Sequence, residues 1–261
     1  MIKALRVTVL LDALVVLAAF PLIAQVYQTG PAGLAQQMPH IYAPYMANIS
    51  RVRILENKDK LNTPYRGGVS VPGGRVPSGR PPSGHSGTAS SNQDTVFHAV
   101  EPAFVPRHLA ALLGKTSQDR RYIEDVLTKC LNNYTDVARQ KGVPLHDVAR
   151  AVNYYISTNY FVYSQGKGPT PSEMAATRDI IRANMGQDET FRRMSDRQKQ
   201  EAYETLIVLA GFADLGYGTA KQSGNESLAA PFREMAKQNL ETLLGVPVEK
   251  IHFTNAGLEI H

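Results

Sequence analysis

Hydrophobic residues recur at helical spacing through most of the chain from residue 95 onward. Between 117 and 141 they return every three or four positions, which predicts an amphipathic helix with one core-facing stripe. Thr116 or Ser117 can cap this helix, and Gly142 ends it. Similar start and stop signals predict four more helices, with approximate ranges 144–162, 171–186, 196–216 and 226–245.

The pattern changes at the C-terminus. Ile251 and Phe253, then Leu258 and Ile260, alternate with polar residues about a TNAG turn, which is typical of a small β-hairpin. The segment 95–100 offers one further strand. The predicted fold is mainly α: a compact bundle of about five helices with a small C-terminal β-hairpin, preceded by a disordered linker.

The composition before residue 95 sets the domain organisation. Residues 63–91 contain 18 Gly, Pro and Ser in 29 positions, and such a stretch buries too little surface to offset its chain entropy. We therefore expect a flexible linker over 63–94, an irregular N-terminal segment over 25–62 and a helical domain over 95–261.

The first 24 residues resemble an export signal. Lys3 and Arg6 form a positive start, and the 12 residues 13–24 are apolar, too short to cross a bilayer but long enough for a signal peptide. A signal peptide over 1–24 predicts a periplasmic or secreted protein. A buried N-terminal helix of a cytosolic protein is the alternative, and the pattern leaves open whether a signal is cleaved or acts as an anchor.

The net charge of +5 is concentrated outside the helical domain. Residues 25–94 carry seven Lys/Arg and three Asp/Glu, whereas residues 95–261 carry 19 of each. A nucleic-acid-binding domain would carry the basic patch on the domain itself, so no nucleic acid is expected. The basic linker predicts only weak attraction to anionic surfaces.

The segment 151–163, AVNYYISTNYFVY, has apolar or aromatic residues on every side of a helix, which predicts a central buried helix. Buried Asn and Tyr side chains need hydrogen-bond partners. Asn153, Tyr155, Asn159 and Tyr160 therefore either line a pocket for a small ligand or bond to neighbouring helices.

No familiar catalytic or metal-binding motif is present in the sequence: HExxH, GxSxG, the P-loop and GxGxxG are all missing. We predict no catalytic residue, no metal ligand and no cofactor. Cys130 lies on the apolar stripe of its helix, which indicates a buried hydrophobic residue rather than a nucleophile. Glu201 and Glu204 offer the one pair of carboxylates for acid–base chemistry. We expect Glu204 to be half-buried and to accept bonds from a helix start, a Lys or an Arg.

Three segments carry a family resemblance: NYYISTNYFVY, DRQKQEAYETLIVLAGFADLGY and ETLLGVPVEKIHFTNAGLEI. They resemble a family of exported bacterial proteins with a helical domain of unknown function, over roughly residues 95–261. The resemblance implies export and a compact helical domain, and it implies no catalytic residue. Its KQ-x-x-Y-E face adds Lys199, Tyr203 and Glu204 to the candidate binding residues.

Three functions remain open from the sequence. The first is a non-catalytic binding or scaffolding module in the periplasm or outside the cell, with another envelope protein or a small ligand as partner. The second is a cell-envelope hydrolase that uses Glu201 or Glu204. The third is a small-ligand or lipid carrier with a Tyr-lined pocket.

Overall fold

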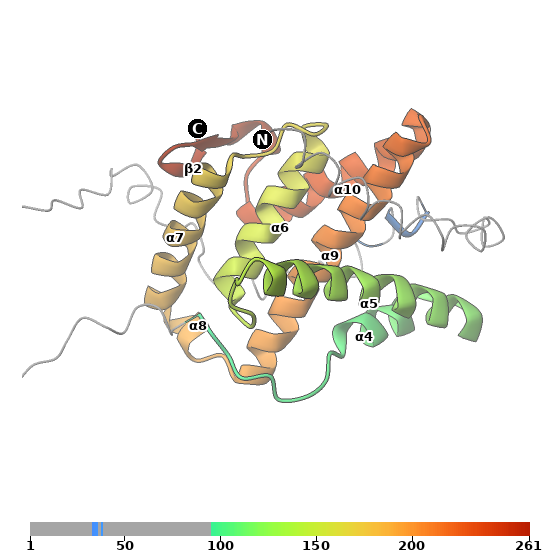
Figure 1. Cartoon of the computed structure of the whole chain (residues 1–261), viewed down its shortest axis with the longest axis horizontal. Coiled ribbons are helices and arrows are strands. Elements are labelled where there is room, and N and C mark those ends of the chain that lie inside the picture. The colour runs from blue at the N-terminus through green and yellow to red at the C-terminus, as the bar shows by residue number, and fades with distance from the viewer. Residues whose placement is uncertain (1–32, 36–37, 39–94) are drawn as a thin grey trace, which may run out of the picture.

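A computed structural model describes residues 33–35, 38 and 95–261, and helices dominate these residues (Figure 1). The elements are α4 (Val105–Leu113), α5 (Ser117–Gln140), α6 (Val148–Tyr163), α7 (Pro171–Gln187), α8 (Glu189–Arg192), α9 (Asp196–Gln222), α10 (Glu226–Leu244), the 3-10 helix η2 (Val248–Lys250), β1 (Ile251–Thr254) and β2 (Gly257–Ile260). The predicted helical fold with a C-terminal hairpin is confirmed. The expected signal peptide and linker lie outside the described residues.

Helix α6 forms the centre of the domain. It packs against α9, α10 and α7 (Figure 1). Its side chains Val152, Tyr155 and Ile156 are fully buried. Helix α5 packs on α9, and α4 packs on α5.

Local capping explains why three long helices begin where the sequence predicts. Thr116 accepts the backbone N–H of Asp119, whose carboxylate accepts the N–H of Thr116 in return. The same reciprocal arrangement starts α7 at Thr170 and α9 at Ser195. At its other end α10 stops at Gly245, whose φ of 67° is easily reached by glycine.

Helix α6 begins later than predicted. The sequence pattern places Pro144 in the first turn, but the helix starts at Val148. His146 has a φ of 59°, a left-handed conformation that interrupts any helix running through it. Asp147 then caps the helix by accepting the N–H of Ala149 at 3.1 Å.

The segment before α4 does not form the additional strand that its sequence offered. Val96 makes a single antiparallel bridge with Asp147, and no longer ladder follows in the described part of the chain. The segment then continues into α4, a nine-residue helix that the sequence pattern did not predict.

The C-terminal hairpin has the predicted position and packs against α7. Its register pairs Ile251 with Ile260 and Phe253 with Leu258. Gly257 has a φ of 112°, and a Cβ atom there would lie 2.7 Å from the Cδ1 atom of Ile180. This close approach brings β2 against α7.

Residues 33–35 and 38 are helical, which the sequence analysis did not predict. Leu34, Ala35 and Met38 belong to the hydrophobic core, with exposed fractions of 8%, 1% and 1%. The N-terminal segment therefore contributes side chains to the core.

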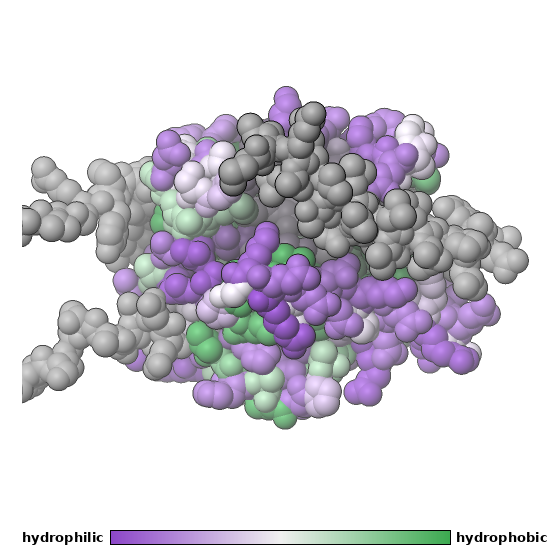
Figure 2. Space-filling view, in the orientation of Figure 1, coloured by the Kyte–Doolittle hydropathy of each residue, from purple (hydrophilic) through white to green (hydrophobic). Residues whose placement is uncertain are grey.

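The face of the domain drawn in Figure 2 is largely hydrophilic, with hydrophobic residues gathered at its lower edge, where the segment before α4 runs. None of the helices in the described ranges has the length and apolar character needed to span a membrane.

Candidate functional site

The seven residues predicted to bind a ligand do not converge on one place. They occupy four locations: Tyr155 and Asn159 in the core, Tyr160 beside the hairpin, Lys199, Tyr203 and Glu204 on α9, and Asn153 in a surface groove.

Tyr155 and Asn159 tie α6 to α10. Asn159 Nδ2 donates to the carbonyl of Tyr155 at 2.8 Å, and Asn239 Nδ2 donates to Asn159 Oδ1 at 2.6 Å. Tyr155 Oη donates to the carbonyl of Asn239 at 3.3 Å. Tyr160 meets the hairpin instead, with its ring 4.9 Å from that of Phe253. These contacts match the alternative in which buried polar groups bond to neighbouring helices.

Glu204 holds the start of α4. Its Oε2 atom accepts the backbone N–H groups of Phe104 and Val105, both at 3.0 Å. Its Oε1 atom accepts Gln200 Nε2 at 2.8 Å. The expectation that Glu204 accepts bonds from a helix start is confirmed, and its exposed fraction of 3% makes it buried rather than half-buried.

Gln200 fixes the segment that leads into α4. Its Oε1 atom accepts the N–H of Val100 at 3.0 Å, and its Nε2 atom donates to the carbonyl of Glu101 at 2.8 Å. Lys199 Nζ lies 4.9 Å from the ring centre of Phe191, in a cation–π arrangement. The KQ-x-x-Y-E face thus makes contacts within the chain.

Tyr203 belongs to an aromatic cluster under the same segment. Its ring lies 5.3 Å from Phe97, 6.0 Å from His146 and 6.1 Å from Tyr134. Burial raises the pKa of the Tyr203 hydroxyl above its ordinary value. The side chain therefore stays neutral and serves packing.

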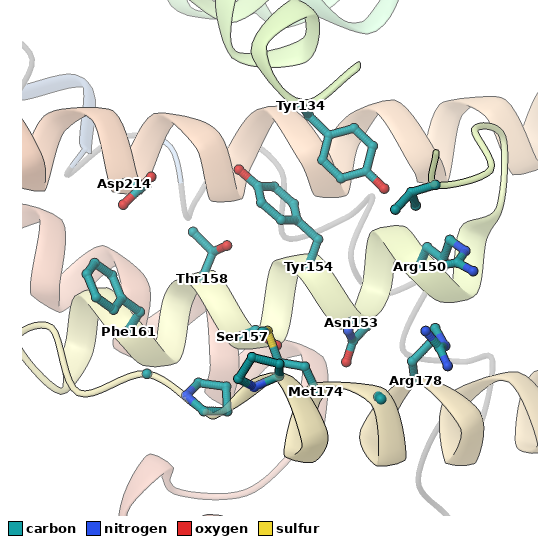
Figure 3. Close-up of a pocket in the computed structure, with 15 residues that line it drawn as sticks. Tyr134, Arg150, Asn153, Tyr154, Ser157, Thr158, Phe161, Met174, Arg178 and Asp214 are labelled. Carbon is teal, nitrogen blue, oxygen red and sulfur yellow. The ribbon is translucent and has the colours of Figure 1, made fainter. Parts of the chain in front are cut away.

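A groove of about 550 Å³ follows the face of α6 that turns away from α10 (Figure 3). Tyr134 of α5 and Asp214 of α9 stand on one side of it, and Met174, Ala175 and Arg178 of α7 stand on the other. Four helices, the loop before α6 and the loop before α7 therefore build the groove.

The floor of the groove is a stripe of α6. Six side chains form it at three- and four-residue steps: Arg150, Asn153, Tyr154, Ser157, Thr158 and Phe161. From the first to the last the stripe covers about 16 Å at 1.5 Å per residue. The sequence predicted a helix buried on every side, but Phe161 is 37% exposed, so this stripe remains open.

Three buried polar atoms in the floor have no hydrogen-bond partner in the described residues: Ser157 Oγ, Asn153 Oδ1 and Arg150 Nε, the last of which lies 3.3 Å from Asp147 Oδ2 in an ion pair. The exposed fraction of Ser157 is 6%. Buried polar atoms in proteins nearly always have a partner, so such atoms in a groove wall are places for a ligand or water. Other buried atoms without one lie outside the groove, on Glu101, Thr177, Arg182 and Asn239.

Two tyrosines form the aromatic wall. The rings of Tyr134 and Tyr154 lie 4.8 Å apart, and Thr158 forms a side-chain hydrogen bond with Tyr154. Burial raises the pKa of Tyr134 to about 12 and also raises that of Tyr154. Both hydroxyls are therefore protonated at neutral pH and can donate hydrogen bonds.

One end of the groove is positive. Arg150 Nε lies 3.3 Å and Arg182 Nη2 lies 2.5 Å from Oδ2 of the buried Asp147, so two arginines share one carboxylate. Nearby, Arg178 donates through Nε and Nη2 to Asp179. These five residues together carry one positive charge that no ion-pair partner among the described residues neutralises.

The opposite end carries Asp214 (Figure 3). The residue is exposed, yet the surrounding protein atoms partly desolvate its carboxylate and raise its pKa. No Lys or Arg in residues 95–261 forms an ion pair with it. The groove therefore has a negative end and a positive end.

The described residues hold neither a metal-ligand cluster nor a reactive thiol. Within the part of the chain that the structure describes, no three His, Cys, Asp or Glu side chains could hold a metal ion. The Cys130 thiol is buried, which raises its pKa to about 12 and makes it a poor nucleophile at neutral pH.

Of these groove residues the sequence pattern predicts Asn153 as a binding residue but not Tyr154, Ser157 or Phe161. A signal was present: Asn153 and Ser157 are four positions apart, so they share one face of an otherwise aromatic and aliphatic helix. Arg150 extends the same face by one turn.

Comparison with protein families gives one match. The model of DUF6683, a family of unknown function, matches residues 5–261. The chain belongs to DUF6683. The DUF6683 match extends well beyond the 95–261 over which the resemblance was expected, and it includes the linker. No curated protein and no solved structure shows significant similarity to this DUF6683 chain.

Proposed function

We propose that this DUF6683 protein is a non-catalytic binding module that holds a small polar ligand in the α6 groove. The observation that carries the proposal is the unpartnered Ser157 Oγ atom, buried in a groove large enough for a ligand. Asn153 Oδ1, one helical turn away, is also buried without a hydrogen-bond partner and supports the proposal.

The contacts of Glu204 favour this proposal over a hydrolase. A general acid or base must reach the substrate proton. Both carboxylate oxygens of Glu204 are already bonded, to the start of α4 and to Gln200. The proposal also differs from a carrier with a cavity around Tyr155, because that side chain is fully buried between helices.

We further propose that the module works outside the cytoplasm. The support is the positive start with Lys3 and Arg6 followed by the apolar run 13–24, all outside the described residues. Export places the groove where it can meet a periplasmic or extracellular ligand.

The binding proposal can be tested with a thermal-shift screen of the full chain. The compounds are amino acids, short peptides, amines and neutral oligosaccharides, and a ligand should raise the melting temperature by mass action. Ser157→Ala and the groove-filling Ala175→Trp should abolish the shift for any true ligand. Ser117→Ala, at an exposed position of α5, is the matched control and should leave the shift intact.

A shift that persists in both groove variants would place binding elsewhere and contradict the proposal. Export has a separate test, expression in a bacterium with the natural N-terminus. The mature protein should start near Gln25 and be recovered from the periplasm or medium. Soluble cytoplasmic protein that retains Met1 would contradict export.

A further inference from the structure

The charges of the groove are separated along its length. Figure 3 shows Asp214 at one end, and Arg150 with Arg178 at the other. Asp214 and Thr158 both interact with the Tyr154 hydroxyl, and Thr158 follows Arg150 by eight positions on α6. Eight positions correspond to about 12 Å along a helix axis. A ligand that satisfies both ends must therefore carry a positive and a negative group about 12 Å apart.

The Asp214 end is suited to an ammonium group. Its carboxylate has no cationic partner in the described chain, and it lies on the side of the groove toward which the Tyr154 hydroxyl points (Figure 3), whose pKa it helps to raise. Phe161 is the second aromatic wall at this end. An ammonium group would neutralise Asp214 and could also contact the faces of these rings.

The opposite end is suited to a carboxylate. The two arginines around Asp147 leave one positive charge over, and the side chains of Arg150 and Arg178 are 20% and 26% exposed. The hydrogen bonds of Arg178 to Asp179 use its Nε and Nη2 atoms, so further N–H groups of the guanidinium remain for a ligand.

The middle of the groove is suited to a peptide backbone. Asn153 Oδ1 can only accept a hydrogen bond, and the Ser157 hydroxyl can accept or donate. An extended peptide supplies N–H and C=O groups and advances about 3.3–3.6 Å per residue. A span of about 12 Å then corresponds to three or four residues.

We propose that the α6 groove binds a short zwitterionic peptide of three or four residues, with its N-terminal ammonium at Asp214 and its C-terminal carboxylate at Arg150 and Arg178. This inference rests on the proposed binding function and names its ligand class. Small apolar side chains of the peptide would meet Met174 and Ala175 of α7.

Calorimetric titration of the full chain with tetraalanine tests the proposal. Tetraalanine should bind, and either N-acetylation or C-terminal amidation should weaken binding by about tenfold or more, because each removes a charge-assisted contact. Asp214→Asn should weaken binding of the free peptide, and N-acetylation should then cause no further loss of affinity. Arg178→Gln should likewise weaken binding of the free peptide, and C-terminal amidation should then cause no further loss.

Exposed residues of α5 provide matched controls. Asp136→Asn and Arg139→Gln change the same charges outside the groove, and both should leave the affinities and the effects of capping unchanged. The affinities of four peptides (free, N-acetylated, C-amidated and doubly capped tetraalanine) for these four variants identify which end of the groove binds which end of the peptide.

Several results would overturn the peptide proposal. One is that tetraalanine does not bind. Another is that the doubly capped peptide binds with the same affinity as the free one. A third is an Asp214→Asn protein that remains fully sensitive to acetylation. If another compound still needs Ser157 in the thermal-shift screen, the binding function survives and the peptide class alone is wrong.

Discussion

The two faces of α6 both carry buried polar side chains, but only those on the inner face have hydrogen-bond partners. On the inner face, Asn159 donates to Tyr155 and accepts from Asn239, and all three residues are fully buried. On the groove face, Asn153 Oδ1 and Ser157 Oγ are equally hidden from solvent but have no partner. Both faces belong to one helix, so the difference comes from what packs against each of them.

The difference separates a structural polar group from a candidate binding group. A satisfied buried amide stabilises the packing of two helices, and its loss leaves a partner exposed to an apolar environment. An unpartnered amide oxygen in a groove contributes little to folding and remains able to accept a hydrogen bond from a ligand. Paired substitutions on the two faces can therefore test the assignment.

The largest expected difference involves two neighbouring tyrosines. Tyr155→Ala should lower the free energy of unfolding by about 2–5 kcal/mol, because it empties a fully buried site. Tyr154→Ala should cost less, about 1–2 kcal/mol, because this side chain is only partly buried against the core and its ring also contacts Tyr134. Urea denaturation of both variants gives the comparison. Equal losses would show that the two faces are packed alike.

Glu204 extends the test to polar contacts in the core. Glu204→Gln should lower the free energy of unfolding by about 1–3 kcal/mol, because a charged acceptor for two backbone N–H groups is lost. Binding in the groove should not change once the protein is folded. Glu201→Gln, on the same helix, is the control and should cost less. A stable Glu204→Gln protein that has lost an activity of the wild type would instead support the hydrolase hypothesis.

The two asparagines of α6 give the closest comparison. Asn159→Ala leaves the buried amide of Asn239 without an acceptor and should cost about 1–2 kcal/mol. Asn153→Ala removes an atom that already lacks a partner, and its effect on stability should stay within about 0.5 kcal/mol. Chemical denaturation measures both effects. A larger loss for Asn153→Ala would mean that this side chain has a structural role.

These results also show which features the sequence could predict. The helices α5, α7 and α9 have local signals, since Thr116, Thr170 and Ser195 each pair with a residue three positions later. Helix α4 has no side-chain cap of its own. Its cap is Glu204, which lies 99 positions from Val105, so the sequence around α4 contains no sign of it.

The groove was harder to predict for a related reason. Periodicity places Asn153 and Asn159 on different faces of one helix, but it does not say which face a neighbouring helix covers. That depends on α10, which packs on the inner face, and on α7, which stands at the edge of the groove. The sequence therefore supplied Asn153 as a candidate together with six residues that lie elsewhere.

The smallest expected effect concerns Asp214 and pH. Desolvation raises the pKa of Asp214 in the folded protein above its ordinary value of 3.8, so the native state holds this proton more tightly than the unfolded chain does. Stability should therefore fall as pH rises through the interval between the unfolded and folded pKa values, and the loss should persist above that interval. Asp214→Asn removes the charge and should be slightly more stable than the wild type at pH 7.

The gain from Asp214→Asn should be within about 0.5 kcal/mol, because the residue is exposed and solvent screens its charge. It should shrink as the pH is lowered toward 3.8, where the wild-type carboxylate is also protonated. Thermal denaturation between pH 4 and pH 8 measures the difference, with Asp136→Asn as the exposed control. An Asp214→Asn protein that is less stable at pH 7 would show that the carboxylate already has a stabilising partner. Asp214 would then be unavailable to the ammonium end of a peptide, and the contrast between the two faces of α6 would not extend to this end of the groove.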